Sequence, residues 1–290
     1  MLETFVPMQI KTSGASIHLL KGGSGSPLLL LHGYPQTHVM WHKIAPRLAE
    51  TFTVVLADLR GYGDSSKPAG EPDHANYAKR AMAQDMVEVM SQLGYEEFAV
   101  VGHDRGARVA HRMALDYAQR VKKAAVLDIA PTYKMYMTAD KEFATVYYHW
   151  FFLIQPADHP ERLLAAQPEY YLRSRLEQWA GDPSAFTPEA LDEYIRCFRD
   201  PACIHGTCED YRASASIDLQ HDEADMQQKV RCPLLVLWGE KGFIERKYNV
   251  LATWRERADH VQGHAIPSGH FLAEEAPEET YTALRAFLDT

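Results

Sequence analysis

The chain has little cysteine, no long apolar run and a deficit of positive charge. Its 290 residues include four cysteines, none in a C-x-x-C pair. We therefore expect no zinc site and free, mostly buried thiols, as in a reducing cytoplasm. No stretch approaches the ~18 apolar residues of a membrane span, and no basic segment precedes an apolar one at the N-terminus, so we expect no signal peptide. The net charge of −9 argues against a nucleic-acid binder.

What the chain does contain is a regular alternation of short apolar runs with helical stretches, which predicts an α/β fold. A mostly parallel sheet, flanked by helices on both faces, accounts for strands that are apolar throughout. An N-terminal hairpin precedes the first buried strand. We expect strands at 28–31, 52–57, 98–101, 123–129, 233–239 and 264–266, and helices at about 77–93, 107–114, 248–258 and 277–288.

The alternation stops between residues 131 and 230. This stretch is rich in aromatic and charged residues, has helical periodicity and contains no convincing strand. We interpret it as a helical cap inserted into a core formed by residues 1–130 and 231–290. Such a cap would cover the carboxyl ends of the strands, where open α/β sheets bind their ligands.

A strand-to-helix turn, Gly102-His103-Asp104-Arg105-Gly106, is the most informative segment. Glycines two residues either side of a central residue are typical of the nucleophile elbow of the α/β-hydrolase fold. The central residue is usually serine, but here it is Asp104. A carboxylate attacks an sp3 carbon and forms an alkyl ester that water must then hydrolyse. The alternative interpretation is that Asp104 only caps the following helix.

The elbow requires an acid and a histidine later in the chain. His270 lies in a glycine-bearing loop after the last predicted strand, where this fold places its base. Asp128 directly follows a strand and is our candidate for the acid. Glu240 is the weaker candidate, because Gly242 stands where many hydrolases have their aspartate.

Two backbone N–H groups are candidates for an oxyanion hole, which holds the charge that develops when water attacks the ester. One belongs to Tyr34, in the loop His32-Gly33-Tyr34-Pro35, and the other to Arg105, after the nucleophile. An H-G-x-P loop combined with an aspartate elbow is characteristic of epoxide hydrolases and dehalogenases.

The elbow helix begins with two arginines, Arg105 and Arg108, three residues apart and therefore on one face. Arginine binds carboxylates through a fork of donors, so this pair suggests a substrate that is itself a carboxylate. A surface salt-bridge pair is the alternative. In the cap, consecutive aromatic residues at 147–152 offer donors to a departing halide. His149, Trp150 and Tyr211 are the candidates, with ordinary aromatic packing as the alternative.

Over nearly its full length the chain resembles fluoroacetate dehalogenases. The matching motifs are G-H-D-R-G-A-R at 102–108, H-G-Y-P-Q-T at 32–37, His149-Trp150, Trp179, C-E-D-Y-R at 208–212 and G-H at 269–270. The resemblance implies a triad of Asp104, Asp128 and His270, with Arg105 and Arg108 on the substrate carboxylate. It further implies His149, Trp150 and Tyr211 on fluoride, Trp179 in the pocket, a homodimer, and no metal or organic cofactor. Tyr34 departs from relatives that often have phenylalanine.

Two rivals remain at this point. An epoxide hydrolase would use the same triad and loop, with Tyr211 and either Tyr147 or Tyr148 protonating the epoxide oxygen, but it would leave the arginines unused. A hydrolase-fold receptor would bind a small acid without turnover. The sequence leaves open the preference between fluoride and chloride and the size of acid accepted.

Overall fold

The computed structural model describes residues 1–290 and contains one eight-stranded sheet in the order β1-β2-β4-β3-β5-β6-β7-β8. β1 pairs antiparallel with β2, and β2 pairs antiparallel with β4, whereas the remaining neighbours are parallel. The predicted α/β-hydrolase architecture, mostly parallel, is confirmed. The strands are β1 (Val6–Lys11), β2 (Ser16–Gly22), β3 (Ser26–Leu31), β4 (Phe52–Ala57), β5 (Phe98–His103), β6 (Val121–Leu127), β7 (Leu234–Gly239) and β8 (Val261–Ile266).

The central strands were predictable because they are buried on both faces. Every residue of β4 and β7 is buried, so each reads as an unbroken apolar run. The edge strand β8 begins three residues earlier than expected. Its first half, Val261-Gln262-Gly263, alternates between partly buried and exposed positions. This segment therefore has no apolar run from which a strand could be predicted.

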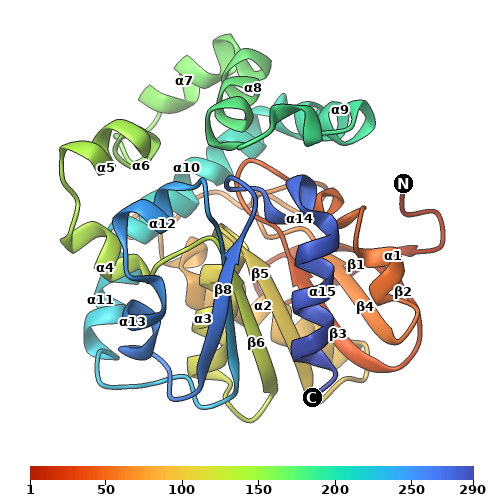
Figure 1. Ribbon diagram of the computed structural model, residues 1–290. Helices are drawn as coiled ribbons and strands as arrows, with labels where there is room; N and C mark the ends of the chain where they lie inside the picture. The colour runs from red at the N-terminus through yellow and green to blue at the C-terminus, as the bar shows by residue number, and fades with distance from the viewer.

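Helices cover both faces of the sheet (Figure 1). The expected helix at 248–258 is shorter than predicted: α13 covers only Val250–Arg255, because the chain is extended at Tyr248 and Asn249, and a separate helix, α12, ends at Lys247. The Asn249 side chain caps α13 by accepting a hydrogen bond from the Ala252 N–H at 3.2 Å. The core helices are η1 (His38–Trp41), α1 (Ala45–Leu48), η2 (Ala75–Tyr77), α2 (Lys79–Gln92), α3 (Arg105–Asp116), α12 (Phe243–Lys247), α13 (Val250–Arg255), α14 (Leu272–Glu275) and α15 (Pro277–Leu288).

Only helices occupy the segment between β6 and β7. Helices α5 to α9 stand above the carboxyl ends of the strands, whereas α4 and α11 lie beside the core near α13 (Figure 1). The elements are α4 (Thr132–Met137), α5 (Lys141–Val146), α6 (His149–Phe152), α7 (His159–Ala166), α8 (Pro168–Trp179), η3 (Pro183–Ala185), α9 (Pro188–Phe198), α10 (Pro201–Ala215) and α11 (Ile217–Ala224). The domain boundaries at 131 and 230 stay a prediction.

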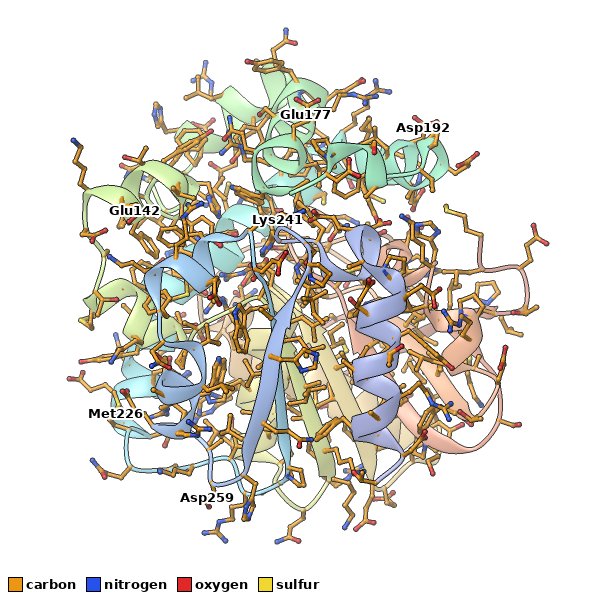
Figure 2. All side chains as sticks on the ribbon, in the orientation of Figure 1. Glu142, Glu177, Asp192, Met226, Lys241 and Asp259 are labelled. Carbon is orange, nitrogen blue, oxygen red and sulfur yellow. The ribbon has the colours of Figure 1, made fainter.

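Side chains fill the space between these helices and the sheet (Figure 2). One buried apolar cluster includes Leu31 and Val126 of the sheet together with Trp150 and Tyr211 of the inserted segment. All four cysteines are free, and three of them are buried, as expected. None of the helices is both long and apolar enough to cross a membrane.

Candidate active site

Asp104 lies at the sharp turn between β5 and α3, with φ 45° and ψ −111°. A side chain other than glycine is strained in this left-handed region. A Cβ on Gly102 would overlap the Gly106 carbonyl, and one on Gly106 would overlap the His32 carbonyl. The flanking glycines are therefore required by close packing. The Asp104 side chain makes no capping hydrogen bond, so the helix-cap interpretation is wrong.

The loop after β3 reaches the same carboxylate. The Tyr34 N–H donates to Asp104 Oδ1 at 2.9 Å, as expected for an oxyanion donor next to the nucleophile. The loop is fixed by His32, whose Nε2 accepts from the Leu59 N–H at 3.0 Å. Arg105 opens α3, at a position where backbone N–H groups have no partner within the helix.

His270 and Asp128 meet beside this turn. His270 Nδ1 lies 2.6 Å from Asp128 Oδ2, and Asp128 Oδ1 accepts from the Gly239 N–H at 3.0 Å. Glu240 is exposed, so the structure supports Asp128 as the partner of the histidine. A Cβ at Gly242 would lie 3.5 Å from Asp128 Oδ1. An acid at position 242, after β7, would therefore reach the same histidine as Asp128, which follows β6.

The surrounding charges lower the pKa of Asp104 and raise the pKa of His270. Burial raises the pKa of Asp104, but the positive charges of His270, Arg105 and Arg108 outweigh it and lower this pKa. Burial lowers the pKa of His270, yet its hydrogen bond to Asp128 and the charges of Asp128 and Asp104 raise it above 6.5. Asp104 is consequently an ionised carboxylate at neutral pH, and His270 can exchange a proton near neutrality.

Arg105 is more constrained than the sequence suggested. Its Nε and Nη2 donate to the two carboxylate oxygens of Asp210 at 2.8 and 2.7 Å, which leaves only Nη1 buried and unpaired. Asp210 also binds Lys79 and accepts from the Tyr62 hydroxyl at 2.6 Å. The predicted fork toward a substrate is therefore limited to one nitrogen. Asp210 was missed because nothing in the sequence pairs residues 105 and 210.

Arg108 is buried without any carboxylate partner. Its Nη1 donates to the Ala130 carbonyl at 3.0 Å and to the Thr132 hydroxyl at 2.9 Å, and Nε is unpaired. Burial and the neighbouring Arg105 lower its pKa from 12.5. The surface salt-bridge interpretation is wrong, and this buried cation, which has no carboxylate in contact, favours an anion nearby.

His149, Trp179 and Tyr211, which we call the cap cluster, come from α6, α8 and α10 and surround the Tyr34 ring. Ring centroids lie 4.6 Å apart for His149 and Trp179, and 5.4 Å apart for His149 and Tyr211. The His149 Nδ1, Trp179 Nε1 and Tyr211 hydroxyl are buried and unpaired. Burial lowers the pKa of His149 well below 6.5, so this ring is neutral.

The remaining predicted aromatic residues are placed differently. Trp150 stacks over the Arg108 guanidinium at 4.8 Å and lies 6.3 Å from the Tyr211 ring. Tyr147 is buried with its ring 5.5 Å from His149. Tyr148 is 38% exposed, which favours Tyr147 over Tyr148 as a partner for Tyr211 in epoxide chemistry.

The sequence analysis did not identify Arg175 of α8 as a site residue. This side chain is buried, its Nε and Nη1 are unpaired, and its guanidinium lies 5.7 Å from the Trp179 ring. The one available signal was its position four residues before Trp179, on the same helix face. Arg175 adds a third positive charge near the cap cluster.

The chain is similar to a family model and to several known proteins. A family model described as alpha/beta hydrolase fold matches residues 26–277. A fluoroacetate dehalogenase of Burkholderia sp is 47% identical over 99% of this chain and 95% of its own length. A soluble epoxide hydrolase of Corynebacterium sp. (strain C12) is 34% identical over 96% of each chain. A crystal structure of an alpha/beta hydrolase from Nostoc sp PCC 7120 has 70% identity and a TM-score of 0.98, covering 99% of each chain. These matches confirm the resemblance that the motifs indicated.

Proposed function

The chain belongs to the alpha/beta hydrolase fold family, and from this premise we propose that it hydrolyses the carbon–halogen bond of a 2-haloacetate. Fluoroacetate is the favoured substrate, and the products are glycolate and halide. The 47% identical fluoroacetate dehalogenase supports this choice of reaction. The proposed nucleophile, acid and base are Asp104, Asp128 and His270.

One observation carries the proposal: residues near Asp104 and His270 have buried polar atoms without a partner. The charges of Arg105 and Arg108 act on Asp104, and the Trp179 ring lies 5.7 Å from the His270 ring. The unpaired atoms include Arg105 Nη1, Arg108 Nε and Trp179 Nε1, and guanidinium and indole nitrogens can only donate. Leaving a buried donor unpaired costs about 1–3 kcal/mol. A small anion that accepts these hydrogen bonds removes this cost, and a haloacetate offers both a carboxylate and a developing halide.

In the first step, the carboxylate of the substrate binds Arg105 Nη1 and Arg108. Ionised Asp104, whose pKa is lowered by the surrounding positive charges, attacks the methylene carbon in line. A C–O bond forms as the C–halogen bond breaks, and the halide leaves with the bonding electron pair toward His149, Trp150 and Tyr211. Trp179 lines the pocket beside them.

In the second step, neutral His270 accepts a proton from water while the hydroxide attacks the Asp104 carbonyl. The Tyr34 and Arg105 backbone N–H groups bind the oxyanion. The acyl C–O bond of the ester then breaks, His270 gives its proton to the leaving glycolate oxygen, and the regenerated Asp104 carboxyl loses the remaining proton of the attacking water to solvent. Each turnover therefore converts one haloacetate and one water into glycolate, halide and one proton.

Epoxide hydrolysis is the second candidate, supported by the 34% identical epoxide hydrolase and by the burial of Tyr147 and Tyr211. A neutral epoxide would leave Arg108 without a carboxylate in contact, which disfavours this reaction. A receptor that binds a small acid without turnover would use the same arginines, and it would need no ordered Asp128–His270 pair.

The deciding experiment measures halide release from fluoroacetate and chloroacetate by wild type and Asp104→Ala. We expect fluoride release by wild type and none by the variant. Chloride release alone would restrict the proposal to a general haloacetate dehalogenase. If neither halide appears and styrene oxide is hydrolysed, the epoxide reaction replaces the proposal. Tight binding of haloacetate with no product would favour the receptor.

Two further properties belong to the proposal. A cytoplasmic location is supported by the four free cysteines, since such thiols persist under reducing conditions. A homodimer is supported by Leu163 and Tyr170, large apolar side chains of α7 and α8 that are exposed. The molar mass from light scattering tests this assembly, because a monomer is 32.9 kDa.

A further inference from the structure

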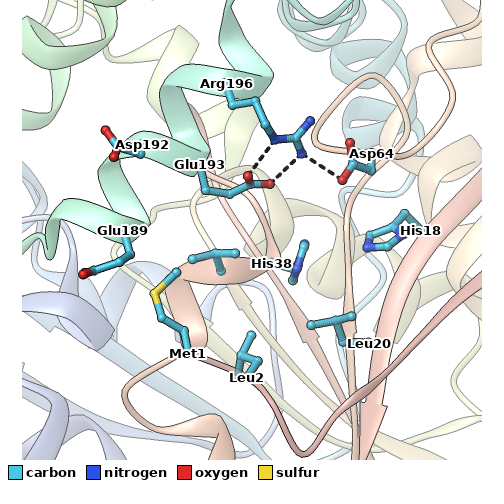
Figure 3. A pocket seen from close by; sticks show the side chains of 11 residues that line it. Met1, Leu2, His18, Leu20, His38, Asp64, Glu189, Asp192, Glu193 and Arg196 are labelled. Atoms are coloured by element: carbon cyan, nitrogen blue, oxygen red, sulfur yellow. Dashed lines mark hydrogen bonds and ion pairs between the residues drawn. The ribbon is translucent and has the colours of Figure 1, made fainter.

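A pocket of about 640 Å³ lies away from the proposed active site, between the N-terminal strands and α9. Figure 3 shows His18 and His38 among the lining residues, with Arg196 of α9 hydrogen bonded to Glu193 of the same helix and to Asp64. Its lining includes four carboxylates, from Asp64, Glu189, Asp192 and Glu193, of which Asp64 and Glu193 are hydrogen bonded to Arg196. Such an excess of negative charge attracts cations.

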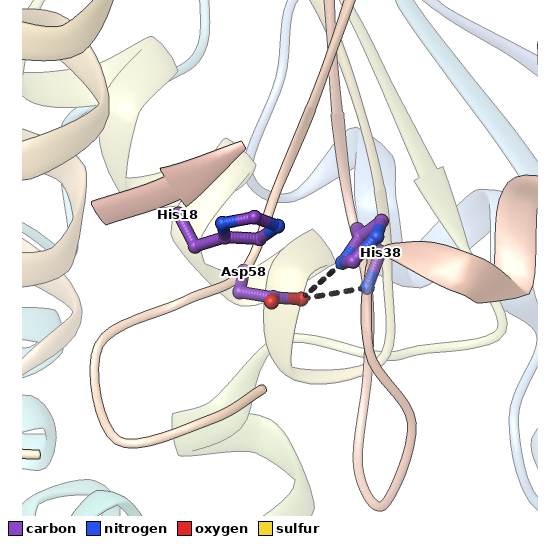
Figure 4. Close-up of side chains that lie close together, drawn as sticks. All are labelled: His18, His38 and Asp58. Carbon is purple, nitrogen blue, oxygen red and sulfur yellow. Dashed lines mark hydrogen bonds and ion pairs between the residues drawn. The ribbon is translucent and has the colours of Figure 1, made fainter. Parts of the chain in front are cut away.

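Three groups with metal-binding chemistry meet at this pocket (Figure 4). His18 of β2, His38 of η1 and Asp58, which follows β4, bring one ligand atom each to within 4.8 Å of the others. The His18 and His38 ring centroids are 5.3 Å apart. Imidazole nitrogens of this kind suit zinc, copper and nickel.

Asp58 fixes the orientation of His38. Its Oδ1 accepts from the His38 backbone N–H at 2.8 Å and lies 2.9 Å from His38 Nδ1. Because an ionised carboxylate only accepts, Nδ1 carries the proton, and in the neutral ring Nε2 keeps a free lone pair for a metal ion. A histidine held by a carboxylate through its other nitrogen is the usual arrangement around bound zinc.

We propose that His18 and His38 bind one divalent transition metal ion, represented by Zn²⁺, with Asp58 as the positioning residue of His38. Water completes the coordination, and the four pocket carboxylates supply the favourable field. The sequence-based expectation of no metal rested on cysteine spacing. It could not anticipate this cluster, because the fold alone brings residues 18, 38 and 58 together.

A second cluster of possible ligands provides an internal comparison. Glu161, His205 and Glu209 also lie within 4.8 Å of one another, but Arg212 Nη1 contacts the carboxylates of Glu161 and Glu209 at 2.6 and 2.7 Å. This guanidinium already neutralises the cluster. Asp58 has no arginine or lysine partner, so the first cluster is the better site for a cation.

The test is calorimetric titration of tag-free, EDTA-treated protein with ZnCl₂, with MgCl₂ in parallel. We expect one Zn²⁺ per chain, weaker Mg²⁺ binding, and a Zn²⁺ affinity at least about tenfold lower in His18→Ala. His18 makes no side-chain hydrogen bond that the substitution would remove, so folding should persist, and His18→Gln repeats the test. His260→Ala, at an exposed histidine, should leave binding unchanged.

Several outcomes would overturn the proposal. Wild type that fails to bind Zn²⁺ at micromolar concentration would do so, as would His18→Ala with unchanged affinity. Loss of binding in His205→Ala would move the site to the second cluster. A zinc-soaked crystal provides an independent readout, because the anomalous peak must lie between the His18 and His38 rings.

Discussion

The proposed triad and the cap cluster are neighbours, with the Trp179 and His270 rings 5.7 Å apart, but they differ in how their polar atoms are held. Asp104, Asp128 and His270 each have a hydrogen-bond partner from another part of the chain. In His149, Trp179 and Tyr211, by contrast, a buried polar atom is left without any partner. The difference indicates that the triad is positioned before substrate binds, whereas the cap cluster completes its hydrogen bonds only with a ligand.

The largest expected effect comes from the triad. In His270→Asn the first step still runs, because Asp104 remains ionised, but no base activates water. Turnover should fall by at least about 10³-fold, and intact mass spectrometry should show the protein carrying one carboxymethyl group from the substrate. Normal turnover by this variant, or its loss without any covalent adduct, would contradict the proposed division of roles.

A smaller effect is expected in the cap cluster. Tyr211→Phe removes one donor to the leaving halide and almost no volume. A hydrogen bond to a charged group contributes about 1.5–3 kcal/mol, so kcat for fluoroacetate should fall about 10- to 100-fold and for chloroacetate less. Tyr148→Phe, at an exposed ring, is the matched control and should keep wild-type rates. Equal losses with the two substrates would argue against a contact with the halide.

The smallest expected effect is the pH dependence of chloroacetate turnover. The base must be neutral. Burial lowers the pKa of His270, but the hydrogen bond and charge of Asp128, which persist when Asp104 is esterified, raise it. Chloride leaves easily, so ester hydrolysis should limit turnover of chloroacetate. Its rate should be full above this pKa and fall about tenfold per pH unit below it. Glu240→Gln, which alters an exposed side chain, should reproduce the profile. A rate that stays constant as the pH is lowered, or an acidic limb displaced in that variant, would contradict the assignment.

The sequence predicted the elements whose pattern is local. The apolar run at 52–57 and the helix at 277–288 agree with the structure at both ends, because full burial and a proline at the helix start mark them. The proposed triad was found in the same way. Each member follows a strand, and the carboxyl ends of parallel strands meet at one edge of the sheet.

What the sequence could not provide depends on packing between distant segments. Arg105 pairs with Asp210, and His18 approaches His38, from different elements. The burial of Arg175 without a partner likewise depends on how α8 packs. No periodicity or spacing encodes such contacts. The arrangement of the cap helices could not be predicted from the sequence either, because aromatic residues at consecutive positions are compatible with several ways of packing the helices.

Asp210 has a consequence for engineering chimeric enzymes. It belongs to α10 of the inserted segment, yet it neutralises Arg105 and Lys79 of the core. Replacing the segment with one from another hydrolase would leave two buried cations uncompensated, and breaking one buried ion pair alone costs about 3–5 kcal/mol. The insertion is therefore not an exchangeable module. A transplant would have to bring an acid at this position, or remove both cations together with it.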